Sequence, residues 1–432
     1  MSKKLAIIGG GISGLSAAFF ALQKGHTVDL YEKSNWLGGL ADSVDFDGLM
    51  IERFYHFICG GDDRLLSLAG RLGLGDRIRF RPTKTAYYLN GRYYPFTSGF
   101  DLLGFSALPF SSRIRFGLNV AESKLSSRWE HLDDLTAKDW LIRRTGVRVY
   151  RAIWEPLLKI KFHDQHDRIS AAWIWHRIHR VATSRRTLLS KERMGYFIGG
   201  SQTLIAALEK SILGAGGKIF LGTEIISLER SMGRFLIASR NEQRNGYDGV
   251  VLSIPLPRSA RIVQPLDPAY ARKLSSIEFI GVVCGLFRLR KPVSGAFWLN
   301  INDPRLPANG LIEYTNLNPM PEIVSDHIVY IPLYVPENHP WYSRDESSLK
   351  QEFFQILNTI NPELSKEDII GFRSFRDPYA QAVCPIGFKA KVPALATPIP
   401  GLFLLDSTQL YPSDRALSGL IGLAETMNQK YL

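Results

Sequence analysis

The feature that most restricts the fold of this chain is a glycine-rich turn close to its N-terminus. The turn follows a short apolar run, Leu5–Ile8, and reads GxGxxG over Gly9, Gly10, Gly11, Ile12, Ser13 and Gly14. Residues 15–24 then carry apolar side chains at helical spacing, and Thr27–Tyr31 forms a second short apolar run that ends at Glu32. A strand, a glycine-rich turn, a helix and a second strand in this order predict a parallel α/β unit that binds a dinucleotide. We expect Ile12 and Ser13, at the start of the helix, to lie against the cofactor.

Each glycine of this turn has a mechanical reason. Gly9 permits the tight turn, Gly11 lets backbone N–H groups approach a pyrophosphate, and Gly14 lets the helix pack closely on the strand. Glu32 stands eighteen positions after Gly14, where a carboxylate accepts hydrogen bonds from the adenosine ribose. Glycine-rich turns also occur for purely structural reasons, and the flanking strands, helix and acid favour the dinucleotide interpretation.

A second glycine pair follows the acid. The segment KSNWLGGLADS begins at Lys33 and contains Gly38, Gly39 and Leu40. With the first turn, it resembles the flavoprotein superfamily of monoamine oxidases, protoporphyrinogen oxidases and phytoene desaturases, to which UDP-galactopyranose mutase is related. The resemblance implies FAD, because the second glycine pair helps to bind the FAD diphosphate there. A glycine pair taken alone is also compatible with a surface turn.

Two later segments extend the resemblance. Residues 196–228 are similar to the unit that returns to the FAD domain, and the residue matching Ile225 touches the adenine through its backbone there. Near the C-terminus, Asp406 matches the acid that binds the ribityl chain, although Leu405 stands where the family usually has glycine. The turn at Leu417 and Ser418 implies a helix N-terminus directed at the flavin, where its partial positive charge stabilises a reduced ring.

The length of 432 residues predicts two or three domains. We expect an α/β fold in which a Rossmann-like FAD-binding domain is built from discontinuous segments and joined to a second, α+β substrate domain. The predicted FAD-binding segments are 1–60, 196–260 and 381–432. The substrate domain would comprise a mainly helical segment, 61–195, and a strand-rich segment, 261–380, with strands at Val282–Leu289 and His327–Val335.

Catalytic candidates are fewer than cofactor candidates. Amine-oxidising relatives commonly carry a lysine on the strand matching Gly281–Phe287, a run that has none here, so the resemblance argues against amine oxidation. Tyr55 and His56 lie in a run that passes beside the flavin in relatives, and we take them as the catalytic candidates. A histidine between apolar neighbours is also compatible with a core role.

Charge suggests a partner surface. Residues 139–196 hold 13 Lys/Arg and 5 Asp/Glu. The net charge of this segment is 13 − 5 = +8, which is most of the formal net charge of +12 of the chain. With the apolar stretch around Pro109, this segment predicts either contact with an anionic membrane surface or a core helix with a solvated end. Trp173, Arg177, Arg185 and Arg186 belong to a run of aromatic and basic residues, but without a nucleic-acid-binding fold signature we expect no nucleic-acid partner.

No metal site is predicted. The HDQHD cluster at residues 163–167 is typical of a solvated turn, and the three cysteines show no ligand or disulfide spacing, which favours a cytoplasmic location. Cys384 is interpreted as a buried thiol, although covalent attachment of flavin is conceivable there.

The predicted activity is removal of hydride by FAD from an apolar or amphiphilic small molecule, polyprenyl-like, carotenoid-like or porphyrinogen-like, with reoxidation by oxygen or another acceptor. Two alternatives stay open. One is a redox-neutral, flavin-dependent sugar-nucleotide mutase, and the other is a non-catalytic FAD-binding protein at a membrane.

Overall fold

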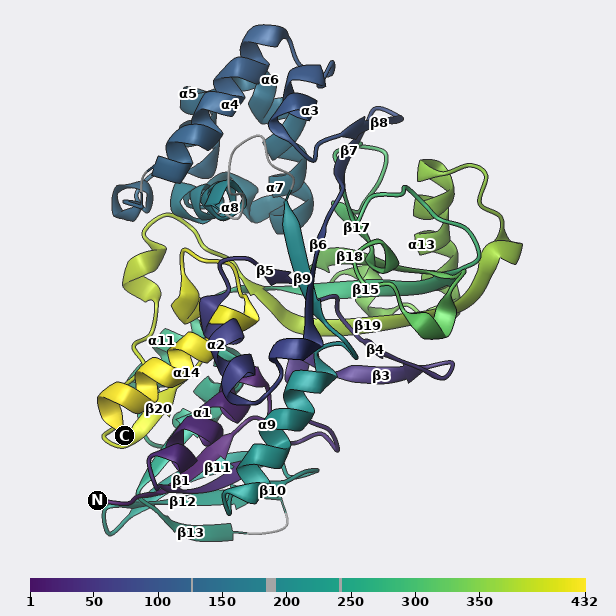
Figure 1. Cartoon of the computed structure of the whole chain (residues 1–432). Coiled ribbons are helices and arrows are strands. Elements are labelled where there is room, and N and C mark those ends of the chain that lie inside the picture. Colours follow the sequence, from purple (N-terminus) through teal and green to yellow (C-terminus); the bar gives the residue numbers. More distant parts are fainter. Residues whose placement is uncertain (126, 184–191, 241–242) are drawn as a thin grey trace.

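The computed structural model describes residues 1–125, 127–183, 192–240 and 243–432. Both termini and the middle of this chain meet in a five-stranded sheet of order β10-β2-β1-β14-β20, in which every neighbouring pair is parallel (Figure 1). Its strands are β1 (Lys4–Ile8), β2 (Thr27–Tyr31), β10 (Lys218–Phe220), β14 (Gly249–Leu252) and β20 (Leu402–Leu404). The predicted α/β class with a Rossmann-like parallel sheet is confirmed.

The two faces of this sheet are covered by different layers. Because side chains alternate along a strand, Leu5 and Ile7 of β1 pack in one core and Ala6 and Ile8 in another. The first core lies under the helices α1 (Ile12–Gln23), α9 (Gln202–Gly214) and α14 (Leu417–Tyr431). The second lies under an antiparallel sheet of β11 (Ile225–Ser231), β12 (Arg234–Ser239) and β13 (Gln243–Tyr247).

A second, seven-stranded sheet has the order β19-β15-β18-β17-β16-β7-β8. Its strands are β7 (Thr85–Leu89), β8 (Arg92–Pro95), β15 (Phe279–Leu289), β16 (Trp298–Ile301), β17 (Gly310–Glu313), β18 (His327–Val335) and β19 (Ile369–Ala382). The expected strands at 282–289 and 327–335 are confirmed. Val283 and Phe287 face α13 (Glu346–Ile360), whereas Cys284 and Tyr330 face the opposite core.

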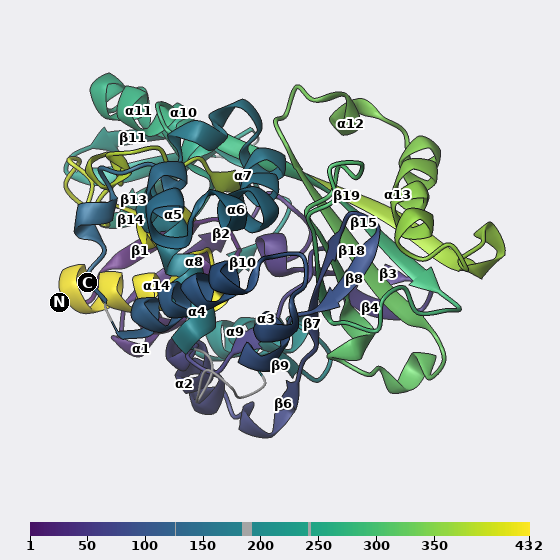
Figure 2. The ribbon, with the colours of Figure 1, turned by 90° about the horizontal axis from the view of Figure 1, so that it is seen from above.

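A helical layer lies at one end of the molecule, at the top of Figure 1 and nearest the viewer in Figure 2. It consists of α3 (Gly99–Gly104), α4 (Phe110–Leu125), α5 (Ala137–Thr145), α6 (Val147–Val149), α7 (Glu155–Phe162) and α8 (Ala171–Thr183). Within the described residues, no helix combines the length and apolar character needed to cross a bilayer.

Short elements join the layers. They are β3 (Ser43–Phe46), β4 (Leu49–Glu52), β5 (Ile58–Cys59), β6 (Ile78–Pro82), β9 (Arg193–Phe197), α2 (Asp63–Arg71), α10 (Leu256–Val263), α11 (Pro268–Ser275) and α12 (Pro340–Ser343).

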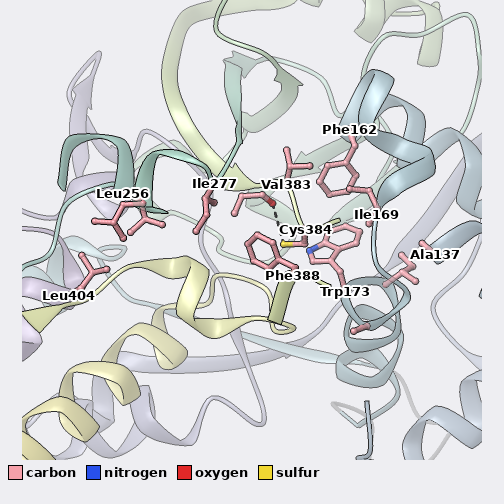
Figure 3. Packing of buried hydrophobic residues seen from close by; sticks show 14 of the residues in the cluster. Ala137, Phe162, Ile169, Trp173, Leu256, Ile277, Val383, Cys384, Phe388 and Leu404 are labelled. Atoms are coloured by element: carbon pink, nitrogen blue, oxygen red, sulfur yellow. Dashed lines mark hydrogen bonds between the residues drawn. The ribbon is translucent and has the colours of Figure 1, made fainter. Parts of the chain in front are cut away.

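One buried cluster connects the helical layer to the parallel sheet. It contains Trp173 of α8, Cys384 and Phe388 after β19, and Leu404 of β20 (Figure 3). Burying aromatic rings of this size stabilises an interface by roughly 1.5–3 kcal/mol per side chain. The cluster therefore packs the helical layer against the segment after β19 and continues to β20 of the parallel sheet.

Candidate functional site

The first glycine turn is shaped by close packing. Gly9 has a φ of +109°, and a Cβ there would lie 2.3 Å from the Ser253 carbonyl oxygen. A Cβ on Gly14 would lie 1.9 Å from the Gly9 carbonyl oxygen. At Gly11 the nearest atom is 3.9 Å away, so its outer side is open. The structure thus excludes side chains at Gly9 and Gly14 and leaves Gly11 accessible to a ligand.

The second glycine turn lies against the first. The Gly38 N–H donates to the Gly10 carbonyl at 2.8 Å, and a Cβ on Gly39 would lie 3.2 Å from the Gly11 Cα. Leu40 follows in a short 3₁₀ turn and is half-buried. The two turns, residues 9–14 and 38–39, form one continuous backbone surface that is largely buried but open at Gly11 and Gly39, and we call it the glycine cradle.

The start of α1 faces this cradle and suits an anion. Helix α1 begins at Ile12 after Gly11, without a capping side-chain hydrogen bond and without an acidic residue in its first turn. Ser13 follows and is buried. N–H groups left unpaired at a helix N-terminus attract phosphate through hydrogen bonds and the helix dipole. The cradle therefore has the properties needed to bind the FAD diphosphate.

Glu32 lies beside the first glycine turn. Its buried carboxylate accepts hydrogen bonds from the N–H groups of Gly10 and Ser34, both at 2.8 Å. The Thr223 N–H donates to the Glu32 carbonyl at 2.8 Å, which brings the start of β11 at Ile225 close to Glu32. Lys33, next to Glu32, is exposed. The structure thus brings Glu32 and Ile225 together although they are far apart in sequence.

The C-terminal candidates lie at the end of β20. Asp406 is buried, which raises the pKa of its carboxyl group, and its Oδ1 accepts hydrogen bonds from the Thr408 N–H and hydroxyl at 2.8 and 2.7 Å. Helix α14 begins at Leu417 and, like α1, has neither a capping side chain nor an acid in its first turn. The Ser418 hydroxyl accepts a hydrogen bond from the Leu65 N–H at 3.2 Å and so connects the start of α14 to α2.

Tyr55 and His56 lie in the segment between β4 and β5, and both are partly exposed. The Tyr55 ring lies 5.5 Å from the Trp298 ring and 6.0 Å from the Tyr330 ring, measured between centroids. Phe57 contacts Trp298 as well, at 6.1 Å. These four rings, Tyr55, Phe57, Trp298 and Tyr330, form what we call the aromatic wall.

A family comparison agrees with this geometry. The model of the flavin-containing amine oxidoreductase family matches residues 12–408. The chain belongs to this family. Its cofactor is accordingly FAD, and the glycine cradle, Glu32, Asp406 and the uncapped start of α14 fit the diphosphate, ribose, ribityl and flavin ends of that molecule.

Individual members of the family resemble the chain at low identity. A coproporphyrinogen III oxidase of Staphylococcus aureus is 25% identical over 288 residues, 59% of this chain and 61% of the relative. A 15-cis-phytoene desaturase of Synechococcus elongatus is 25% identical over 280 residues, 59% of this chain and 58% of the relative. The alignments thus span about three fifths of these relatives. A crystal structure of a protoporphyrinogen oxidase homologue from Exiguobacterium sp. 255-15 shares the fold, with a TM-score of 0.76, 20% identity and coverage of 99% and 98%.

A cluster of charged residues just before the start of α14 was not foreseen from the sequence. Asp414 pairs with Arg177 at 2.9 Å, and Lys161 and Arg415 lie close to both. Burial opposes ionisation of Asp414, but Arg177 and Lys161 outweigh burial and hold the pKa of Asp414 well below its ordinary value. Burial lowers the pKa of Lys161 to about 7. We call Lys161, Arg177, Asp414 and Arg415 the cation cluster.

The available sequence signals for this cluster were weak. Asp414 and Arg415 stand just before the predicted flavin turn at Leu417, and this position indicates that they lie near the site. Lys161 lies between Ile160 and Phe162, and only the packing of α7 against β18 shows where it points.

Other sequence hypotheses are resolved by the fold. The HDQHD segment forms a 3₁₀ turn in which the His163 Nε2 contacts the Tyr334 carbonyl at 2.6 Å, and the described residues hold no group of His, Cys, Asp and Glu suited to a metal. Cys384 is buried, which raises the pKa of its thiol and makes it a poor nucleophile. Helix α8 is not a free cationic face, because Arg177 pairs with Asp414 and Arg180 with Asp62; Arg185 and Arg186 lie outside the described residues.

Proposed function

We propose that this flavoprotein removes hydride from an apolar or amphiphilic small molecule held against the aromatic wall. The observation that carries this proposal is the wall itself. Tyr55, Phe57 and Trp298 are partly exposed, whereas Tyr330 behind them is fully buried. Partly exposed aromatic rings that pack on a buried core favour an apolar ligand. Polyprenyl-like, carotenoid-like and porphyrinogen-like molecules all match this chemistry, and oxygen or another acceptor would take the electrons.

The strand composition supports oxidation at carbon rather than at an amine. In β15 the run Gly281–Phe287 contains no lysine, and Cys284 and Leu286 on its inner face are fully buried. A dehydrogenation at carbon requires chiefly a rigid pocket that positions the C–H bond. Bound FAD supplies the hydride acceptor.

The two catalytic candidates, Tyr55 and His56, are both uncharged at neutral pH. Burial lowers the pKa of His56 to about 4, and Arg415 adds to this, so His56 is a neutral imidazole at pH 7. Burial raises the pKa of Tyr55 well above its ordinary value, so its hydroxyl stays protonated. Both are therefore suited to orient a substrate through hydrogen bonds.

Anaerobic mixing of the FAD-loaded protein with candidate polyprenyl, carotenoid and porphyrinogen substrates tests the proposal. We expect the absorbance band of oxidised flavin to bleach with a cognate substrate and to return when air is admitted. The mutase alternative predicts instead that only prereduced protein turns over a UDP-sugar, without net electron transfer. The cation cluster favours this alternative, because arginine and lysine bind phosphate oxygens. A flavin that no candidate reduces would point to a non-catalytic role.

A matched pair of variants tests the aromatic wall. Tyr55→Leu removes a ring from the wall and is expected to slow flavin reduction about tenfold or more while FAD content stays unchanged. Tyr93→Leu is the control, because Tyr93 is an exposed ring on β8 of the same sheet. Equal reduction rates in both variants would contradict a role for the wall.

We also propose that the helical layer contacts an anionic membrane surface. Six large apolar side chains of α3 and α4 are exposed: Phe100, Leu103, Phe110, Ile114, Leu118 and Leu125. Phe110, Ile114 and Leu118 form one stripe at a spacing of four residues. The same helical layer carries exposed arginines on α4 to α6 and on the π-helical turn Tyr150–Trp154, and one of them, Arg144, pairs with Glu122. They are Arg115, Arg143, Arg144, Arg148 and Arg151. An apolar stripe combined with arginines suits an interface of anionic lipids.

Cosedimentation with vesicles tests this surface. We expect binding to vesicles that contain anionic lipid, weaker binding at high salt, and loss of binding in Phe110→Glu/Leu118→Glu. Leu213→Glu, at an exposed leucine of α9, is the control and should bind like the unmodified protein. Absence of binding to anionic vesicles at low salt would overturn the proposal, and dimerisation through the stripe would assign it to a second copy.

A further inference from the structure

A buried lysine in the substrate half has no carboxylate within ion-pair distance among the residues that the structure describes. Lys161 of α7 is 4% exposed, and its ammonium group lies between two aromatic rings, 5.0 Å from the Trp173 centroid and 4.6 Å from the Tyr334 centroid. Within the described part of the chain, its Nζ forms no ion pair and no hydrogen bond. Aromatic faces stabilise a cation only in part, so the charge is incompletely compensated.

A second cation contacts the same tyrosine. Arg415 donates a hydrogen bond to the Tyr334 hydroxyl at 3.3 Å, and its guanidinium carbon lies 5.9 Å from the Tyr334 centroid. Among the residues that the structure describes, no carboxylate lies within ion-pair distance of Arg415 either. Lys161 and Arg415 therefore both contact Tyr334, and both have N–H groups that can donate to a ligand.

The nearby acids are already engaged. Asp414 forms its short ion pair with Arg177 at 2.9 Å, and Arg180 lies 3.8 Å from Asp62. Asp414 attracts Lys161 only at longer range. The region thus contains more positive than negative charge after its internal ion pairs are counted. An uncompensated charge in a protein interior costs free energy, and proteins retain such charges mainly at functional sites.

We propose that Lys161 and Arg415 together bind one oxyanion, a carboxylate or a phosphate, carried by the substrate. This inference rests on the proposed function and refines it, because it makes the substrate amphiphilic and acidic. Lysine and arginine have only donors, and carboxylate and phosphate oxygens are their strongest acceptors.

The position of the pair links it to the reaction site. Arg415 stands two residues before the start of α14, and it lines a small cavity with Gln381, Cys384, Thr408 and Ser413. Tyr334 lies four residues after Tyr330 of the aromatic wall, and both side chains face the same core. An acidic group held by Lys161 and Arg415 would leave the apolar part of the molecule on the aromatic wall.

The test is anion binding to the oxidised, FAD-loaded protein in the absence of turnover. Inorganic phosphate, pyrophosphate, acetate and glutarate are titrated separately, and both the flavin absorbance change and the heat of binding are recorded. We expect saturable binding by the unmodified protein, and a loss of about tenfold or more in affinity in Lys161→Met and in Arg415→Gln. A preference for phosphates or for carboxylates identifies the group that the substrate carries.

Matched controls separate this proposal from trivial outcomes. Lys159→Met removes a lysine from the same helix, but Lys159 is exposed and pairs with Glu155, so its anion affinity should be unchanged. Lys161→Arg keeps the charge and should retain most of the binding. The proposal is overturned if no anion binds saturably, or if Lys161→Met and Lys159→Met bind alike. Because no substrate is oxidised in this assay, its result is independent of whether flavin reduction is ever observed.

Discussion

The glycine cradle and the cation cluster, both assigned to the functional site, are built on opposite principles. In the cradle, backbone atoms approach so closely that a Cβ on Gly14 would lie 1.9 Å from a carbonyl oxygen, and Glu32 accepts two backbone hydrogen bonds. In the cation cluster, Lys161 is buried without an ion pair or a hydrogen bond among the described residues, and Asp414 attracts it only at longer range. The packing that stabilises the cradle therefore also shapes it for the cofactor. In the cation cluster, by contrast, the buried Lys161 lowers the stability of the folded protein.

This difference predicts at which positions substitutions lower the free energy of unfolding and at which they raise it. A close-packed backbone site tolerates no added atom, so changes in the cradle should cost stability. A buried unpaired charge is expected to be replaceable by an apolar side chain with a gain in stability and a loss of function. The predictions below test this contrast, beginning with the largest expected effect.

Gly14→Ala should unfold the FAD-binding half, because the added Cβ would overlap the Gly9 carbonyl. We expect a loss of more than about 3 kcal/mol and a protein recovered without FAD, measured by thermal unfolding and by flavin content. Gly11→Ala is the matched change, since its nearest atom is 3.9 Å away and its φ of −72° suits alanine. It should fold and yet bind FAD weakly, and a folded, FAD-loaded Gly14→Ala would break the comparison.

Lys161→Met should raise the free energy of unfolding. The upper limit is about 5 kcal/mol, which is the free-energy equivalent of the difference between the pKa of Lys161 in the unfolded and in the folded chain. The pKa of Lys161 is lowered by burial from 10.5 to about 7, in the presence of Asp414, Arg177, Arg415 and Cys384. Between these pH values the unfolded chain binds more protons than the folded one, so this residue's destabilising effect is complete below pH 7 and disappears as the pH approaches 10.5.

The stability difference between Lys161→Met and the unmodified protein should therefore be largest near pH 6 to 7 and shrink toward pH 10. Chemical denaturation across this range measures it, and taking the difference removes the contribution of other titrating groups. A destabilised Lys161→Met at pH 7 would show that Lys161 has a structural role, contrary to the comparison.

Glu32→Gln should have an intermediate effect. The glutamine retains one acceptor oxygen, so one of the N–H groups of Gly10 and Ser34 loses its partner. We expect a loss of about 1–3 kcal/mol and weaker FAD retention, measured by thermal unfolding and by FAD release on dilution. Glu229→Gln, at an exposed position of β11, is the control and should behave like the unmodified protein.

His56→Gln should have the smallest effect on pH dependence. Because the pKa of His56 is lowered to about 4, its imidazole does not titrate between pH 5 and 8. The pH profile of flavin reduction should therefore keep its shape in the variant even if the rate changes. Loss of an ionisation near pH 6.5 on substitution would show that His56 acts as an acid or base.

Much of the FAD half was predictable because its signals are local. The expected strands Leu5–Ile8 and Thr27–Tyr31 appear as β1 and β2, and the helix expected after Gly14 appears as α1. The expected helix start at Leu417 is also observed. Glycine turns, apolar runs and helix starts depend on neighbours within a few residues, so a single segment reveals them.

The substrate half was less predictable because its contacts join distant segments. The basic stretch was interpreted as a possible membrane surface, yet Arg177 and Arg180 of α8 turn toward Asp414 and Asp62. Their spacing of three residues places both on one face of a helix, but only the fold shows which acids that face meets.

The sequence alone determined that this chain binds FAD in a parallel α/β domain. The backbone conformations that the glycine turns need depend on the residue type at each position, which can be read directly from the sequence. Only the tertiary structure decided that Lys161, Tyr334 and Arg415, from α7, β18 and the turn before α14, share one place. The reason is physical: close backbone approach requires a specific residue type at a specific position, whereas side chains separated by more than a hundred residues meet only when the sheets and helices have packed.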